Sequence, residues 1–225
     1  NLDITFDQGL ADIFLTPSDV GHYTLNLLDD SSGFVKGIDG TPLPVISTSA
    51  TGAWTARPFA IALVVPGNPG AQNASGPLFR GAGEPFTLRV GGALYSSADD
   101  IDGDGVANAG TNLMDNGFAP SFGQEGESVV LSAQLLAPAT GVNPGLDGPV
   151  LQASDYVSGV TSASGFRFSE VGVIDIAGVI GDGNYLGAGS AYTARMAGKS
   201  GPVGRFVPDH FTVTVDDNGV LDAAC

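Results

Sequence analysis

The segment FRFSEVGVIDIAGV (residues 166–179) decides the fold class, because apolar and polar residues alternate along it. A period of two puts the apolar side chains of an extended strand on one face, whereas a helix needs a period near 3.6. The same alternation, bounded by Gly, Pro, Asn or Asp, recurs at residues 3–6, 22–28, 59–65, 86–92, 128–136 and 210–215. Short alternating strands between turn residues predict an all-β protein with an Ig-like antiparallel β-sandwich fold.

One of these segments, SVVLSAQLL (128–136), also permits a helical interpretation. It opens on the β-branched pair Val129–Val130, and Pro138 follows it at the distance expected of a terminator. A strand is therefore favoured here too.

Composition supports a folded core and excludes two classes of partner. The chain has 225 residues, of which 43% are hydrophobic, and its 34 Gly and 14 Pro indicate many turns. The formal net charge is −16 with only 8 Lys and Arg, so nucleic-acid binding is excluded and an anionic membrane would repel the chain. No apolar run reaches the roughly 18 residues of a membrane span. Such acidity suits a secreted protein and divalent cations.

The most acidic stretch is DDIDGDGVAN (99–108). Asp100, Asp102 and Asp104 fall at positions one, three and five of a calcium loop of the EF-hand type, and Gly105 falls at position six, where the chain turns sharply. Alternate side chains of a tight loop point to one centre. We therefore predict a Ca²⁺ site, with a solvated acidic turn as the alternative.

The rest of the predicted ligand set is less regular. Val106 can offer its carbonyl oxygen, and Asn108 can bind directly or through water. Position twelve is Thr111 instead of an acidic residue, so Asp115 or Asp99 is expected to supply a further carboxylate. An all-oxygen set favours calcium over magnesium, and the lack of adjacent His or Cys disfavours zinc.

No catalytic motif accompanies this loop, and we expect the protein not to be an enzyme. His22 and His210 lie in strand-like segments and are interpreted as structural. Glu125 and Glu127 resemble a glycosidase pair only in the way that any acidic chain supplies such pairs. The sequence contains neither a G-x-S-x-G elbow nor an H-E-x-x-H motif.

Aromatic residues leave a second interpretation open. Trp54, Tyr95, Tyr156 and Tyr185 could form a sugar-stacking face. The favoured interpretation is that Trp54 packs near a domain junction beside Arg57.

The chain ends point to a fragment of a longer protein. The sequence starts at Asn1 and not at a Met, which is consistent with removal of a leader. Cys225 is the single cysteine and the last residue. It is either a free thiol or half of a disulfide whose partner lies beyond the fragment.

Similar segments recur in the same order: 6–15 with 168–178, 21–28 with 190–197, and 56–63 with 204–215. This weak repeat predicts tandem modules. Residues 1–55 would be the closing strands of one sandwich, residues 56–203 a complete module with the calcium loop, and residues 204–225 the start of the next module or a final strand. A single sandwich with chance similarities is the alternative.

Five segments in order resemble the MshQ-like group, large bacterial proteins named for biogenesis of the mannose-sensitive haemagglutinin (MSHA) type IV pilus. They are TARPFAIAL (55–63), AGEPFTLRV (82–90), APSFGQE (119–125), FRFSEVGVIDI (166–176) and GRFVPDHFTVTV (204–215). The resemblance runs from about residue 6 to residue 215. It implies a secreted or cell-surface protein with repeated β-sandwich modules, encoded with pilus genes, and it supplies no catalytic residues.

These observations together predict a non-enzymatic, extracellular fragment of a pilus-associated or cell-surface protein with a structural and adhesive role. Its expected partners are other modules of the same polypeptide or pilus components, and a glycan or a receptor on a host or other surface. A carbohydrate-binding module and a subunit of a surface filament or layer are the alternatives.

Overall fold

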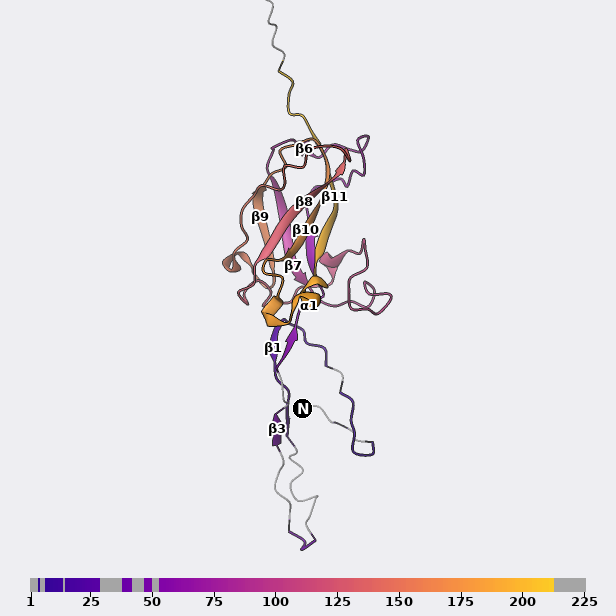
Figure 1. Ribbon diagram of the computed structural model, residues 1–225, viewed down its shortest axis with the longest axis vertical. Helices are drawn as coiled ribbons and strands as arrows, with labels where there is room; N and C mark the ends of the chain where they lie inside the picture. Colours follow the sequence, from indigo (N-terminus) through magenta and orange to yellow (C-terminus); the bar gives the residue numbers. More distant parts are fainter. Residues whose placement is uncertain are drawn as a thin grey trace, which may run out of the picture.

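The computed structural model describes residue 4 and residues 7–13, 15–28, 38–41, 47–49 and 53–212 (Figure 1). Most of its ordered elements are strands, which confirms the predicted all-β sandwich. The strands are β1 (Gly21–Tyr23), β2 (Asn26–Leu28), β3 (Ser47–Ser49), β4 (Trp54–Ala56), β5 (Ala60–Val64), β6 (Arg80–Gly81), β7 (Phe86–Ala93), β8 (Val129–Ala137), β9 (Val160–Phe166), β10 (Gly172–Ile180) and β11 (Gly198–Val207).

In the part of the chain that the structure describes, helical structure is confined to short pieces between strands. They are the one-turn helix α1 (Ser190–Ala194) and the 3₁₀ turns η1 (Leu113–Asp115), η2 (Ala153–Asp155) and η3 (Tyr185–Gly187). Within the described ranges, no helix has the length and apolar character needed to cross a membrane.

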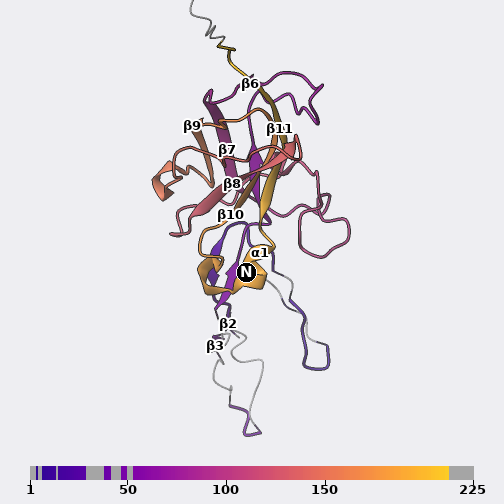
Figure 2. The same cartoon turned by 45° about the horizontal axis from the view of Figure 1, so that its top comes forward.

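Two sheets form the sandwich, in the orders β5-β7-β9 and β6-β11-β10-β8. All pairs are antiparallel except β6–β11, which is parallel. The strands follow the order of an Ig-like domain. The second and third strands of that order correspond to β7 and β8, and its last two strands correspond to β10 and β11. Figure 2 shows the sheets from a second direction, with the strands running along the long axis of the body.

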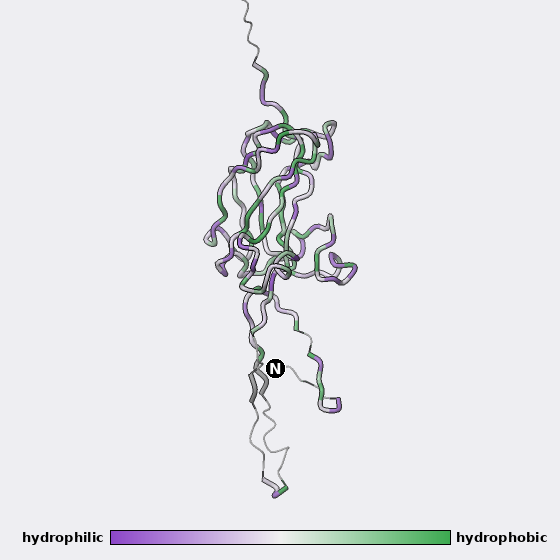
Figure 3. The backbone as a smooth tube through the Cα atoms, viewed as in Figure 1, coloured by the Kyte–Doolittle hydropathy of each residue, from purple (hydrophilic) through white to green (hydrophobic). Residues whose placement is uncertain are grey.

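The core between the sheets is rich in phenylalanine. Phe86, Phe166, Phe168 and Phe206 are each at most 2% exposed, and their ring centroids lie 5.4–6.3 Å apart in the contacting pairs. Aliphatic side chains from both sheets complete the core, among them Ile61, Leu88, Val90, Ile174, Ile176 and Val203. Figure 3 shows hydrophobic residues along the sandwich strands and hydrophilic residues gathered in the loops.

The segment 166–179 joins the two sheets. Phe166 ends β9 in one sheet, and β10 begins at Gly172 in the other. The five residues between them cross the sandwich, and the Phe168 side chain remains buried in the core. The single strand predicted for residues 166–179 is therefore two strands in different sheets. The apolar residues of both strands face the same core.

At one corner the two sheets approach so closely that only glycine fits. The Ile61 N–H donates to the Met196 carbonyl oxygen at 2.8 Å, and Gly198 lies directly against the Ile61 backbone. A Cβ on Gly198 would lie 1.7 Å from the Ile61 carbonyl oxygen. This contact places the α1 loop beside the start of β5.

The part of the chain before the sandwich forms two small ribbons, in which β1 pairs with β4 and β2 pairs with β3. In Figure 1 they extend below the sandwich, whereas β11 leaves it at the opposite end. The predicted boundary at residue 203 falls inside β11, whose residue Phe206 still pairs with Gly172 and Arg80. The division into tandem modules stays a prediction.

The strands predicted near the two ends of the chain, at residues 3–6 and 210–215, are only partly described by the structure. Most of residues 3–6 lies outside the described residues, as do residues 213–215 and Cys225. Residues 210–212 are described and are not in a strand. Pro208 has no N–H to donate to a ladder, so pairing stops at Val207.

Candidate functional site

The acidic loop 99–108 lies in the long connection between β7 and β8. Gly103 and Gly105 have φ values of 70° and 76°, which allow the chain to turn back on itself. The Gly105 N–H donates to both carboxylate oxygens of Asp100, at 3.2 and 3.1 Å, and the Val106 N–H donates to Asp104 Oδ1 at 2.7 Å. The loop is therefore closed by its own aspartates.

The carboxylates of Asp100, Asp102 and Asp104 come together as the sequence predicts. One oxygen from each lies within 4.8 Å of the others. Two oxygens bound to one Ca²⁺ at about 2.3–2.6 Å can be at most about 5.2 Å apart, so the three fit one coordination shell. Asp100 is buried, whereas Asp102 and Asp104 are exposed.

The other predicted ligands are placed differently. Asn108 Oδ1 accepts from the Ile101 N–H at 2.7 Å, so this side chain ties the loop together. The Thr111 hydroxyl donates to the Asn108 carbonyl oxygen at 3.0 Å. Asp115 lies outside the aspartate cluster in η1, where its Oδ2 accepts from the Asn112 amide at 3.1 Å. The calcium ligand set itself stays a prediction.

Arg57, which the sequence suggested only as part of a junction, connects this loop to the first strand of the sandwich. Its Nη1 donates to the carbonyl oxygens of Pro58 and Phe59 at 2.8 and 2.6 Å, and its Nη2 donates to that of Gly105 at 2.6 Å. Its guanidinium also lies over the Tyr192 ring, 5.3 Å from the centroid. Burial lowers the pKa of Arg57, and the charge of Arg195 lowers it further, although Tyr192 opposes the shift.

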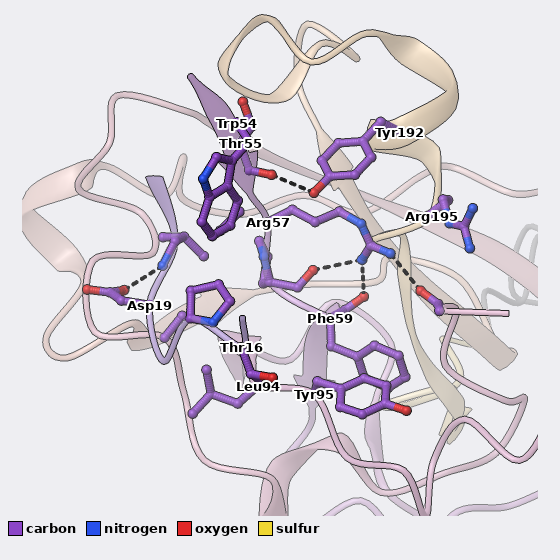
Figure 4. A pocket seen from close by; sticks show the side chains of 16 residues that line it. Thr16, Asp19, Trp54, Thr55, Arg57, Phe59, Leu94, Tyr95, Tyr192 and Arg195 are labelled. Carbon is purple, nitrogen blue, oxygen red and sulfur yellow. Dashed lines mark hydrogen bonds between the residues drawn. The ribbon is translucent and has the colours of Figure 1, made fainter. Parts of the chain in front are cut away.

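A pocket of about 420 Å³ lies beside this arginine (Figure 4). Its walls come from four segments: the segment before β1, the β4–β5 junction, the loop that follows β7 and the loop that follows β10. They are lined by Thr16, Pro17, Asp19, Val20, Trp54, Thr55, Ala56, Arg57, Pro58, Phe59, Leu94, Tyr95, Gly105, Ala119, Tyr192 and Arg195.

Asp19 fixes one wall of the pocket to the sandwich. Its carboxylate accepts from the Ser121 N–H at 2.8 Å and from the Ser121 hydroxyl at 2.7 Å. Partial burial alone would raise the pKa of Asp19, but the hydrogen bonds from Ser121 and Val20 lower it below its usual value. No signal in the sequence links two residues 102 positions apart.

The four aromatic residues predicted as an alternative sugar-stacking face do not form one. Tyr156 and Tyr185 are 4% and 0% exposed and belong to the core. Trp54 stacks on Tyr23, with ring centroids 4.9 Å apart, and lines the pocket together with Tyr95. Trp54 packs at the β4–β5 junction, and a domain junction at this place stays a prediction.

Glu125 and Glu127 support the η3 turn, which precedes the helix α1 that carries Tyr192. Glu125 Oε1 accepts from the Tyr185 hydroxyl at 2.7 Å, and Glu127 Oε1 accepts from the Leu186 N–H at 2.6 Å. Burial raises the pKa of Glu125, although the hydrogen bond from Tyr185 opposes the shift. Both carboxylates therefore hold the η3 turn against the segment before β8.

The two histidines have local partners. His22 Nδ1 is 3.2 Å from the Thr55 hydroxyl, and His210 Nδ1 is 3.0 Å from Asp209 Oδ2. Both contacts agree with structural roles, and the absence of enzymatic activity stays a prediction.

Comparison with protein families gives two matches. Residues 57–165 match the model described as DUF6701, second domain, and residues 170–225 match the model described as DUF6701, third domain. The chain is similar to two consecutive DUF6701 domains. No curated protein and no solved structure matches it. Neither description names a pilus, so the resemblance to the MshQ-like group stays a prediction.

The two matched segments contribute strands to one sandwich. The DUF6701 third-domain match begins just before β10, yet β10 pairs along its length with β8 from the second-domain match. The sequence division between residues 165 and 170 therefore falls in the crossing between the two sheets, where β9 ends and β10 has not begun.

Proposed function

We propose that this chain is a non-enzymatic β-sandwich segment of a pilus-associated or other bacterial cell-surface protein. Its role is structural and adhesive, outside the cell, and Ca²⁺ bound in loop 99–108 stabilises it. The observation that carries the proposal is the convergence of Asp100, Asp102 and Asp104 in a loop that Arg57 attaches to the sandwich. The pilus association rests on the resemblance to the MshQ-like group.

The chemistry of the loop supports an extracellular location. Three carboxylates brought this close repel one another, and a cation relieves that repulsion. The loop lacks an acidic residue at position twelve, so its affinity is expected in the weak class of extracellular modules, with a Kd of about 10⁻⁴–10⁻³ M. A site of that affinity fills only where calcium is millimolar.

The shape of the molecule supports a role in presentation. The chain enters the sandwich from the β1–β4 ribbon at one end and leaves it after β11 at the other (Figure 1). Modules connected in this way follow one another in a line. Calcium in the loop and proline at the Arg57–Pro58 junction would stiffen that line, and the expected partners are neighbouring modules or pilus components.

A thermal melt of the whole chain, with 5 mM calcium or with a chelator, tests the metal. Calcium at ten times its Kd stabilises the folded state by about 1.4 kcal/mol, which raises the melting temperature by a few degrees. Asp102→Ala should lose this rise, whereas Asp12→Ala, an exposed aspartate outside the loop, should keep it. Equal melts with calcium and chelator would remove calcium from the proposal.

The location needs a separate experiment. Intact cells that produce the protein are treated with an external protease, and loss of the sandwich segment is followed by immunoblot. The proposal expects cleavage in intact cells, with a cytoplasmic marker left whole. Protection of the segment until the cells are lysed would contradict a surface role.

A further inference from the structure

We propose that the pocket beside Arg57 binds a sugar acid, meaning a pyranose that carries a carboxylate. This inference rests on the proposed adhesive function, because it names the class of ligand that the surface would recognise. Three features carry it: two arginines next to each other, aromatic side chains in the walls, and a position among the loops at one end of the sandwich.

The arginines supply the charge. Only 8 residues of the chain are Lys or Arg against 24 acidic residues, yet Arg57 and Arg195 both line this pocket. Their guanidinium groups meet at Gly105: Arg195 Nη2 lies 3.1 Å from the position of a Cβ on that glycine, and Arg57 Nη2 binds its carbonyl oxygen. Two adjacent positive charges favour an anion between them.

No ion pair between the described residues involves Arg57 or Arg195, although the Asp100 carboxylate binds the N–H of the same Gly105. The ion pairs of the described residues are Arg80–Glu84, Lys199–Asp175 and His210–Asp209, and none involves the pocket. Asp19 lines the pocket, but its carboxylate oxygens are held by Ser121. Arg195 is exposed, and a planar guanidinium with parallel N–H groups matches a carboxylate in a bidentate geometry.

The walls supply the surface that a sugar ring needs. Tyr95 is 54% exposed, and the partly buried Trp54 and Tyr192 lie on other sides of the pocket (Figure 4). Stacking on Tyr23 and the hydrogen bond from the Tyr192 hydroxyl to the Thr55 carbonyl oxygen, at 2.7 Å, hold two of these rings in place. Preset rings bind an apolar sugar face with little loss of conformational entropy.

The volume and composition favour a sugar over a peptide. A cavity of 420 Å³ lies within the range of about 300–1,000 Å³ that small-molecule sites occupy. An extended peptide is held mainly by main-chain bonds along a sheet edge. This pocket offers guanidinium groups and aromatic rings instead, whereas the Thr55 hydroxyl is bound to His22.

The position also suits recognition. Leu94, Tyr95 and Gly105 belong to the β7–β8 connection, and Tyr192 and Arg195 belong to the β10–β11 connection. In an Ig-like order these correspond to the B–C and F–G loops, which carry the binding surface of variable domains. Loops held by a rigid sandwich vary in sequence without disturbing the core.

The single tryptophan of the chain makes the test direct, because its fluorescence reports on Trp54 alone. The whole chain is titrated with D-galacturonic acid, with N-acetylneuraminic acid, and with D-galactose, followed by emission and by calorimetry. We expect saturable binding of a sugar acid, at least about tenfold tighter than that of galactose. Arg195→Gln should weaken it roughly 10- to 100-fold. Arg167→Gln removes an exposed arginine bound to Gly83 and should leave affinity unchanged.

The two sugar acids separate a plant or microbial polyuronide from a sialylated glycan as the source. Equal affinity for galactose, equal weakening by both arginine variants, or no binding at 20 mM of either acid would overturn the inference. Binding of an acidic tripeptide in place of both sugar acids would overturn it as well. A failed sugar titration together with a calcium-dependent melt would refute the ligand and leave the structural proposal standing.

Discussion

The Arg57 guanidinium lies 2.6 Å from the carbonyl oxygen of Gly105, 48 residues away in the chain. The N–H of the same glycine binds the Asp100 carboxylate. Gly105 therefore links the Asp100 carboxylate to Arg57, which lies just before β5 and lines the pocket. Arg57 and Gly105 both line the pocket, so this contact lies between the loop and the pocket.

Arg57→Gln should destabilise the protein by about 2–3 kcal/mol. The variant loses three charge-assisted bonds to carbonyl oxygens, and the Gly105 carbonyl loses its partner. Urea unfolding measures the change. Arg195→Gln removes an equal charge from the same pocket without such bonds and should change stability by less than about 0.5 kcal/mol. Equal losses in the two variants would show that charge, and not the carbonyl contacts, matters.

Glu125→Gln should stabilise the protein, and more so as the pH rises. Burial raises the pKa of Glu125 above its ordinary value of 4.5, so its stabilising contribution is complete below pH 4.5 and is lost as the pH rises through the folded-state pKa. Glutamine still accepts from the Tyr185 hydroxyl and carries no charge. Melts from pH 4 to pH 7 should show a widening gap between variant and parent, and a constant gap would contradict the burial argument.

Asp19→Ala should loosen the segment before β1, with a cost of about 1–2 kcal/mol, because the Ser121 N–H and hydroxyl lose their acceptor. Hydrogen exchange of the Ser121 amide is the direct measurement, and Asp12→Ala is the exposed control. The pKa of Asp19 is lowered below 3.8, so the parent loses this contribution as the pH falls through the folded-state value. The two proteins should converge in acid, and a gap that persists at pH 2 would argue against the carboxylate.

Gly198→Ala should cost about 3 kcal/mol or more, since its Cβ would overlap the Ile61 carbonyl oxygen at 1.7 Å and force the sheets apart. Gly81→Ala is the matched control, because its Cβ would make only ordinary contacts at 3.7 Å. Denaturant midpoints of the two variants provide the comparison. Similar midpoints would mean that the corner between β5 and β11 opens easily.

The strands were predictable because the alternation of apolar and polar residues within each strand reflects which of its faces is buried. In β8, for example, alternate residues face the core and solvent, and β8 is a strand as Val129, Val130 and Pro138 indicate. The aspartate cluster was predictable for a similar reason, because its spacing sets its geometry.

The pocket was not predictable, because its parts meet only in the folded chain. Asp19 and Ser121 are far apart in sequence, and Arg57 reaches Gly105 across the sandwich end. Tyr156 and Tyr185 were grouped with Trp54 by residue type, yet they lie in the core. Residue type alone does not say which aromatic side chains remain accessible.

The parallel pairing of β6 with β11 has a consequence for a protein pulled from both ends. Backbone bonds from Phe79 to Arg205 and from Ala82 to Val207, at 2.9 and 2.7 Å, lie where the chain leaves the sandwich. Tension between the β1–β4 ribbon and the end of β11 acts parallel to β6 and β11. It therefore loads the backbone hydrogen bonds between these two strands in shear. Bonds loaded in shear share the force and break together, whereas a peeling force breaks them one by one.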